Sequence, residues 1–195
     1  IVQYYMMYIT YKEETLINFL LLFYKNNKKM TLLRDILTQK TQLSLRLLDW
    51  LITNYSKKYN IIYPIYVNKQ KVYFNMYLDY KNQLKAYSKK YFDPFCRQTR
   101  IIVDSKNFKW DLYDENKQIE LKEEHIITTV GQLNFFRWFI ENNGFEYAIN
   151  NIKLIDLDMT NTMTNKMKNK RSVLSPSALK GIYTNHHSIT IEFKT

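Results

Sequence analysis

Basic side chains recur at a four-residue spacing near the middle of the chain. Lys81, Lys85 and Lys89 share one face if residues 79–91 form a helix. Like charges at this spacing repel one another, so the stripe costs stability unless an anion neutralises it. Further basic and aromatic side chains surround it: Lys90, Arg97, Arg100, Tyr80, Tyr87, Tyr91 and Phe92. Cations interleaved with aromatic rings are typical of surfaces that bind phosphates and stack on bases; the alternative is an ordinary solvated lysine face.

A second basic group lies nearer the C-terminus. It comprises Lys166, Lys168, Lys170 and Arg171. Residues 159–171 contain no branched aliphatic or aromatic side chain, so burial cannot offset the entropy lost on ordering them. We predict a flexible basic arm that adds a sequence-independent contact to nucleic acid; the alternative is a plain soluble linker.

The overall charge also favours phosphate-rich partners. The chain has 29 Lys and Arg residues against 18 Asp and Glu, a formal net charge of +11. Such an excess promotes nucleic-acid binding through counterion release. Only six of the 29 are Arg, although Arg is the residue that binds bases and phosphates with two parallel hydrogen bonds. Lys, Ile, Asn, Tyr and Phe dominate while Gly and Pro number three each, so A/T-rich codon usage is the competing explanation of the charge.

A weaker pattern suggests metal-dependent cleavage. Asp104 or Asp111 precedes a Glu-Leu-Lys run that begins at Glu120 and ends at Lys122. Restriction-type nucleases place an Asp and then Glu-x-Lys on neighbouring strands, where the carboxylates bind Mg²⁺ and the Lys steadies the attacking hydroxide. A solvent-facing alternation of Glu and Lys over residues 120–124 explains the same residues. A Mg²⁺-dependent nuclease is therefore our third hypothesis.

Other chemistries lack their residue patterns. The single cysteine, Cys96, has no histidine at an informative spacing, so we expect it to be a buried or incidental residue and not a nucleophile. Asp156 and Asp158 form a D-x-D pair, which we interpret as a solvated surface pair. The three glycines stand alone, so the chain has neither an ATP-binding nor a dinucleotide-binding loop of the usual form. We predict no cofactor, no metal site and no catalytic residue.

The hydrophobic patterns predict an α+β fold. N-terminal helices precede a small antiparallel sheet with packed helices, and a flexible basic linker leads to a C-terminal strand. Helices are expected at residues 13–24, 31–37, 44–59, 79–91, 130–143 and 145–152. Strands are expected at residues 61–67, 72–77, 101–104, 109–113, 118–121 and 188–194.

The helix over residues 130–143 has the clearest signals. Thr129 is a good N-cap, and Gln132 three positions later completes a capping box. Gly144 is expected to end the helix as its C′ residue. Aromatic side chains crowd the helix between Phe135 and Phe139. In our second hypothesis, these rings contact a protein partner.

Four segments are expected along the chain. They are an N-terminal helical segment (residues 1–42), an α+β core (43–158), a flexible basic linker (159–187) and a C-terminal strand (188–195). Residues 1–29 precede Met30, which is a candidate start together with Met6 and Met7, so this stretch need not be native. No run approaches the roughly 18 apolar residues of a membrane span. No small-residue cleavage site follows the first helix, so we expect no secretion signal.

Three stretches resemble an uncharacterised family of giant viruses, the nucleocytoplasmic large DNA viruses. They are LSLRLLDWLITNYSKKYN, QLKAYSKKYFDPFCRQTRI and TTVGQLNFFRWFIENNGFEYA, and a looser match follows in SVLSPSALKGIYTNHHSITIEF. The A/T-biased composition suits such genomes. The resemblance implies a viral origin, and it brings no assigned activity or catalytic residue.

Our leading hypothesis is a non-catalytic viral protein that binds DNA or RNA, or contacts packaged genome, through its basic side chains. The second is an assembly factor that binds virion or host proteins. We expect the protein in the host cytoplasm or the virion, neither secreted nor in a membrane. The sequence indicates no particular oligomeric state.

We expect no nuclease activity. Purified protein incubated with Mg²⁺ or Mn²⁺ should leave DNA and RNA intact, and Glu120→Gln should change nothing. Gel assays of plasmid and RNA substrates provide the measurement. Metal-dependent cleavage that disappears in Glu120→Gln would establish the nuclease hypothesis in place of ours.

Overall fold

The computed structural model describes residues 9–114 and 121–171, and the chain divides into two compact units, Ile1–Met159 and Thr160–Thr195. The described elements confirm the predicted α+β class. The helices are α1 (Tyr11–Tyr24), α2 (Asn27–Leu37), α3 (Leu45–Trp50), the π-helical stretch η1 (Leu51–Tyr55), α4 (Ser56–Lys58), α5 (Met76–Tyr91), α6 (Val130–Glu141), α7 (Gly144–Asn150) and α8 (Ile152–Arg171). The strands are β1 (Ile62–Val67), β2 (Gln70–Asn75), β3 (Arg100–Asp104), β4 (Lys109–Leu112) and β5 (His125–Thr129).

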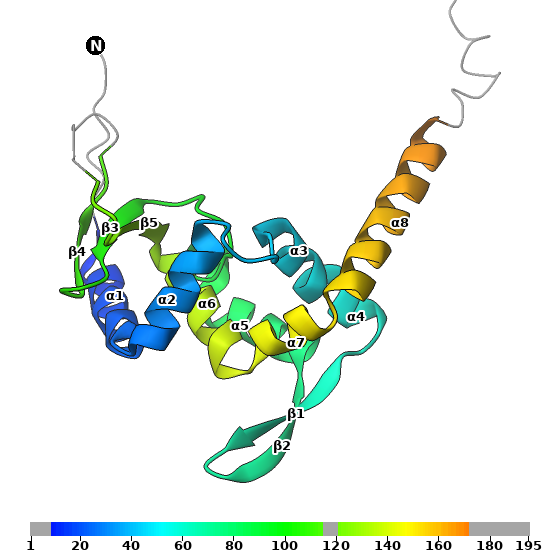
Figure 1. Cartoon of the computed structure of the whole chain (residues 1–195), viewed down its shortest axis with the longest axis horizontal. Helices are drawn as coiled ribbons and strands as arrows, with labels where there is room; N and C mark the ends of the chain where they lie inside the picture. The colour runs from blue at the N-terminus through cyan, green and yellow to red at the C-terminus, as the bar shows by residue number, and fades with distance from the viewer. Residues whose placement is uncertain (1–8, 115–120, 172–195) are drawn as a thin grey trace, which may run out of the picture. The chain divides into compact units, whose positions relative to one another are not determined.

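Helix α6 is buried over most of its surface and organises the first unit. Five of its large apolar side chains are at most 2 % exposed, and Ile140 is half-buried; the five are Leu133, Phe135, Phe136, Trp138 and Phe139. A helix that is apolar all round needs a partner on each face, and α1, α5, α7 and β5 pack against it (Figure 1). The placement of a protein-partner surface on these rings is therefore wrong, because the chain itself covers them.

The start of α6 confirms the predicted cap but not the full capping box. Thr129 Oγ1 accepts a hydrogen bond from Gln132 N at 3.1 Å. The Gln132 side chain turns elsewhere: its Oε1 accepts from Thr128 Oγ1 at 2.9 Å, and its Nε2 donates to the Pro94 carbonyl at 2.8 Å. A tertiary contact thus takes the place of the second half of the box.

The end of α6 also differs from the prediction. Asn143, and not Gly144, has the left-handed backbone (φ 53°), and Gly144 begins α7. Asn enters the left-handed region more easily than most residues. Glycine is needed at position 144 for space, because an added Cβ would lie 2.4 Å from Phe139 Cδ2.

Two small antiparallel sheets complete the first unit. Strands β1 and β2 form the predicted hairpin with a tighter turn, in which Asn68 and Lys69 both have positive φ; that backbone matches the twist of the strands. The second sheet has the order β4-β3-β5. Strands β3 and β4 confirm the predicted pair. The predicted strand at 118–121 lies outside the described residues except for Leu121, which is in no strand.

Helix α1 belongs to the core of the first unit. It begins with a capping box in which the Thr10 and Glu13 side chains each bond the other's backbone. Ile17 and Leu20 are fully buried, and Tyr24 OH donates to the Leu133 carbonyl at 2.8 Å. The described part of residues 1–29 is therefore a structural part of the protein.

Helix α8 continues where a linker is predicted. It begins at Ile152, with Ile155 and Asp158 buried, and it extends to Arg171. Extending an existing helix needs no new nucleation, so a segment without branched aliphatic or aromatic side chains can still be helical. The linker prediction is wrong for residues 159–171. Residues 172–187 and the predicted strand at 188–195 lie outside the described part of the chain.

Replacing Trp138 tests the α6 core. Trp138→Ala should lower the free energy of unfolding by roughly 3–5 kcal/mol. The reason is that it removes a buried ring and the 2.6 Å hydrogen bond from Nε1 to Asp79 Oδ1. Denaturant melts followed by circular dichroism give the measurement. Phe19→Ala is the control, because the Phe19 side chain on α1 is 57 % exposed. It should lower the free energy of unfolding by less than about 1 kcal/mol. Equal losses of unfolding free energy in the two variants would contradict the central role of α6.

Candidate nucleic-acid interface

The predicted basic surface is built where the end of α5 crosses the start of α6. An added Cβ at Gly131 would lie 3.0 Å from the Lys90 carbonyl oxygen, so glycine permits this close approach. Asp93 N donates to the Gly131 carbonyl at 3.2 Å, and Asn134 Nδ2 donates to the Tyr91 carbonyl at 2.9 Å. Together with the Gln132 bond described above, these contacts fix the segment after α5 on a buried helix.

Ser88 interrupts α5 and divides the lysine stripe. Its backbone has φ 58° and ψ 170°, a conformation that residues other than glycine rarely adopt. Lys81 and Lys85 lie before the interruption, one turn apart and exposed, while Lys89 lies after it. The predicted stripe is therefore a pair of lysines plus a displaced third.

Lys90 is held in an ion pair with α1. Its Nζ lies 2.8 Å from Glu13 Oε1, and the Glu13 side chain is only 8 % exposed. Burial alone would raise the pKa of Glu13, but the Lys90 ammonium and the hydrogen bonds from Thr10 outweigh it and lower the pKa to about 2. Lys90 therefore fastens α5 to α1, which makes it a structural residue and a poor phosphate ligand.

Arg97 and Arg100 follow α5 as predicted, but both have partners within the chain. Arg97 Nε lies 3.6 Å from Asp93 Oδ2, and the guanidinium lies 4.3 Å from the centroid of the Phe95 ring. Arg100 interacts with Cys96. Burial raises the pKa of the Cys96 thiol, and Arg100 offsets this only in part. The raised pKa keeps the thiol protonated at neutral pH.

The aromatic rings near the lysines belong largely to the core. Phe92 is 1 % exposed, and its ring centroid lies 5.4 Å from those of Phe135 and Trp138. The ring centroids of Tyr80 and Trp138 lie 6.2 Å apart, and burial raises the pKa of Tyr80 to about 12. Tyr87 stacks on Phe92 at 6.4 Å. The prediction that these rings stack on bases is therefore wrong for Phe92, which is buried. Tyr87 and Tyr91 are half-buried and line a pocket with Lys85, and for them it stays a prediction.

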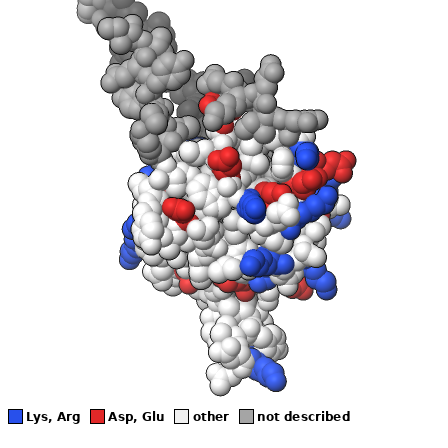
Figure 2. Space-filling model, turned by 90° about the vertical axis from the view of Figure 1, so that its left-hand side faces the viewer, with Lys and Arg blue, Asp and Glu red and all other residues white. Residues whose placement is uncertain are grey.

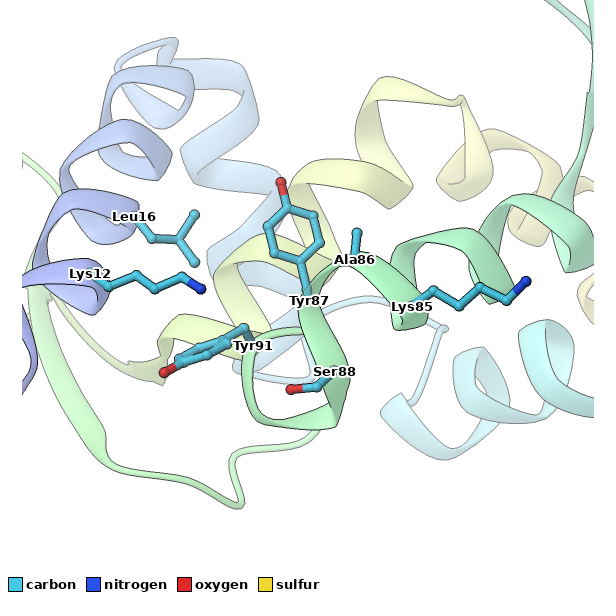
Figure 3. A pocket seen from close by; sticks show the side chains of 7 residues that line it. All are labelled: Lys12, Leu16, Lys85, Ala86, Tyr87, Ser88 and Tyr91. Carbon is cyan, nitrogen blue, oxygen red and sulfur yellow. The ribbon is translucent and has the colours of Figure 1, made fainter.

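A pocket beside the interruption brings a further lysine to α5 (Figure 3). Its volume is about 360 Å³, and its lining residues are Lys12, Leu16, Lys85, Ala86, Tyr87, Ser88 and Tyr91. In Figure 3 the Lys12 side chain extends toward the α5 residues, while the Lys85 ammonium points away from the pocket. The sequence does not connect Lys12 with Lys85, since it is the packing of α1 and α5 against α6, together with the Glu13–Lys90 ion pair, that brings them to one pocket.

Charges on the surface are mixed in sign. On the face shown in Figure 2, Lys and Arg lie beside Asp and Glu. Burial raises the pKa of Asp49, and the positive charges of Arg97 and Lys89 nearby oppose this rise. Within the described residues, no carboxylate lies at ion-pair distance from Lys81 or Lys85. The second basic group, Lys166, Lys168, Lys170 and Arg171, lies at the end of α8 in the second unit.

In the nuclease hypothesis, Asp104 is a metal ligand. In the structure its carboxylate instead accepts hydrogen bonds within the turn that follows β3. Its Oδ1 accepts hydrogen bonds from Lys106 N at 2.8 Å and Asn107 N at 3.0 Å. The Asn107 and Lys106 hydrogen bonds lower the pKa of Asp104. Glu120, the second residue of this hypothesis, lies outside the described residues. Among the residues that the structure describes, no three His, Cys, Asp or Glu side chains form a metal-binding group.

The two carboxylates of the D-x-D pair separate on helix α8. Asp156 is exposed, whereas Asp158 is buried and accepts hydrogen bonds from Trp50 Nε1 and Tyr59 OH, both at 3.0 Å. Asp158 also forms an ion pair with Lys58. Asp158 therefore holds the start of α8 against α3 within the first unit and is not a solvated surface residue.

The sequence comparisons identify the family. A family of unknown function, DUF7197, matches residues 6–188. The chain belongs to the DUF7197 family. It is 36 % identical over 142 residues to the uncharacterized protein L507 of Acanthamoeba polyphaga mimivirus. The predicted resemblance to a giant-virus family is confirmed.

The DUF7197 match includes every helix and strand described above, from α1 to α8. The similarity to the mimivirus protein covers 73 % of this chain and 50 % of that protein, so the chain spans about half the length of this curated relative. No solved structure matches the chain. No helix in the described part of this DUF7197 chain is long and apolar enough to cross a membrane.

The Glu13–Lys90 pair should make stability depend on acid pH. The pKa of Glu13 is lowered from its ordinary value of 4.5 to about 2. The pair's contribution is therefore fully present above pH 4.5 and is lost as the pH falls toward 2. Glu13→Gln should lower the free energy of unfolding at neutral pH by at most about 3 kcal/mol.

Urea melts of wild type and Glu13→Gln at several pH values give the measurement. The difference between them should shrink below pH 4.5. Glu14→Gln, on the exposed side of the same helical turn, is the control. A Glu13→Gln deficit that is independent of pH would contradict the ion-pair explanation.

Proposed function

We propose that this protein binds nucleic acid through its phosphates, without catalysis and with little sequence preference. The observation that supports it is the exposed pair Lys81 and Lys85 on α5, which has no carboxylate at ion-pair distance in the described residues. Two unneutralised cations one helical turn apart destabilise the helix. A polyanion would remove this repulsion and release its own counterions.

Two neighbouring lysines extend this pair. Lys12 lines the same pocket as Lys85, and Lys89 follows the interruption of α5. We call Lys12, Lys81, Lys85 and Lys89 the α5 lysine surface. Lysine ammonium groups act as point charges and do not distinguish base edges, so this surface suits the phosphate backbone of any sequence.

The predicted basic residues divide into two roles in this proposal. Lys90 and Arg97 stabilise the fold through Glu13 and Asp93 and contribute less to binding. The basic group at the end of α8 (Lys166, Lys168, Lys170 and Arg171) supplies a second, sequence-independent contact. The ligand is DNA or RNA in the host cytoplasm, or genome packaged in the virion. The net charge of +11 steers such a polyanion toward the protein.

Salt dependence tests the proposal. If the α5 lysine surface contacts about four phosphates, the slope of log affinity against log salt should be near −4 on duplex DNA. Lys81→Gln with Lys85→Gln should flatten this slope by about two and weaken all sequences alike. The measurement is fluorescence anisotropy with a labelled duplex at several salt concentrations.

A charge-matched variant provides the control. Lys106→Gln with Lys109→Gln removes the same charge at the turn between β3 and β4 and should leave the slope within about one unit of wild type. Equal losses in both double variants would show a general charge effect and contradict the α5 site. Absence of binding by the wild type at low salt would overturn the proposal and leave codon bias as the origin of the charge.

A further inference from the structure

The hairpin β1–β2 projects from the first unit with one face anchored (Figure 1). Tyr63 OH donates to the Asn142 carbonyl at 2.8 Å, and the Tyr63 ring stacks on Tyr147 with centroids 4.9 Å apart. Phe74 pairs with Tyr63 across the hairpin, and its ring centroid lies 6.2 Å from that of Trp138. These contacts hold the inner face on α6 and α7, so the opposite face turns to solvent.

The register of the hairpin determines which residues lie on its outer face. Pro64 pairs with Tyr73, and Tyr66 pairs with Lys71. Directly opposite residues share a face, and alternate residues along a strand do too. The hairpin outer face therefore comprises Ile62, Pro64, Tyr66, Lys71, Tyr73 and Asn75. Tyr66 is 72 % exposed and Tyr73 is 68 % exposed, in contrast to 7 % for Phe74 on the inner face.

The hairpin carries positive charge with no negative charge beside it in sequence. Residues 50–78 contain four lysines and neither Asp nor Glu. Lys71 Nζ lies 5.4 Å from the centroid of the Tyr73 ring, and Lys69 lies in the turn. In Figure 2 the projecting hairpin has basic residues near its tip and no acidic ones. Exposed rings thus stand beside cations that a phosphate can approach without meeting a carboxylate of the hairpin.

We propose that the hairpin outer face binds single-stranded nucleic acid. Tyr66 and Tyr73 stack on successive bases, and Lys69 and Lys71 contact the phosphates. The two tyrosines are diagonal neighbours across the strands, a spacing of about 7–8 Å between backbones. This inference rests on the proposed function and deepens it, because it adds unpaired strands as the class of substrate.

Stacking explains why the substrate is single-stranded. The faces of paired bases are covered by their neighbours in a duplex, which presents only base edges in its grooves. An unpaired strand exposes these faces, and aromatic platforms beside cations bind them without regard to sequence. The α5 lysine surface, in contrast, requires phosphates alone and serves both kinds of strand.

The test compares two labelled probes. They are a fluorescein-labelled oligothymidine of about 20 nucleotides, longer than the site size of a typical stacking platform, and a labelled duplex of the same length. Tyr66→Ser with Tyr73→Ser should weaken binding of the single strand about ten-fold or more. Binding of the duplex should change by less than about twofold.

Matched variants separate stacking from other effects. Tyr66→Phe with Tyr73→Phe keeps both rings and should retain single-strand affinity. Tyr11→Ser removes a tyrosine that is 85 % exposed on α1 and should also retain it. Thermal melts of each variant check folding, and exposed positions on the anchored hairpin are expected to tolerate the change. A 5-iodouracil-substituted strand should photo-crosslink to peptides that contain Tyr66 or Tyr73.

The outcomes distinguish this inference from the proposed function. If wild type binds both probes and the Ser double variant binds both equally well, the proposed function stands and the inference is wrong. If the Ser double variant loses single strand and duplex to the same extent, the hairpin is a general contact and stacking is refuted. A variant that changes only self-association, measured by light scattering, would show that the hairpin binds another copy of the chain. If wild type binds neither probe, both proposals fail together.

Discussion

The burial of α6 over most of its surface is the constraint on which the first unit depends. Its aromatic side chains need apolar partners in every direction, and α1, α5, α7 and β5 supply them. Its buried polar groups need hydrogen-bond partners as well. Gln132 and Asn134 meet this need by bonding the Pro94 and Tyr91 carbonyls, and the Leu133 carbonyl accepts from Tyr24. Packing and hydrogen bonding on α6 therefore determine the course of the chain on either side.

This constraint also decides which basic residues are available to a ligand. Fixing the segment after α5 on α6 turns Phe92 inward and brings Lys90 to Glu13. Lys81 and Lys85 precede this segment and remain on the exposed side of α5. The excess positive charge is thus divided between cations that hold elements together and cations that face solvent. A count of lysines in the sequence cannot make this division.

The two proposed surfaces would bind different chemical groups of a nucleic acid, one its phosphates and the other its unpaired bases. The α5 lysine surface offers exposed cations beside the half-buried rings of Tyr87 and Tyr91, whereas the hairpin outer face offers two largely exposed rings beside Lys71. Charge attracts phosphates of any strand, and rings select bases that are unpaired. Both surfaces lie within the range that matches DUF7197. The hairpin owes its exposed face to α6 and α7 too, because Tyr63 and Phe74 anchor the opposite face there.

The sequence by itself determined the features that depend on near neighbours in the chain. The α+β class, the Thr129 cap, the hairpin and the β3–β4 pair follow from alternation, capping and turn residues within a few positions. The family likewise followed from local stretches of sequence. Contacts between distant residues decided the rest: the interruption at Ser88, the Glu13–Lys90 pair and the proximity of Lys12 to Lys85. Local patterns carry no information on these contacts, because the packing around α6 joins residues that are remote in sequence.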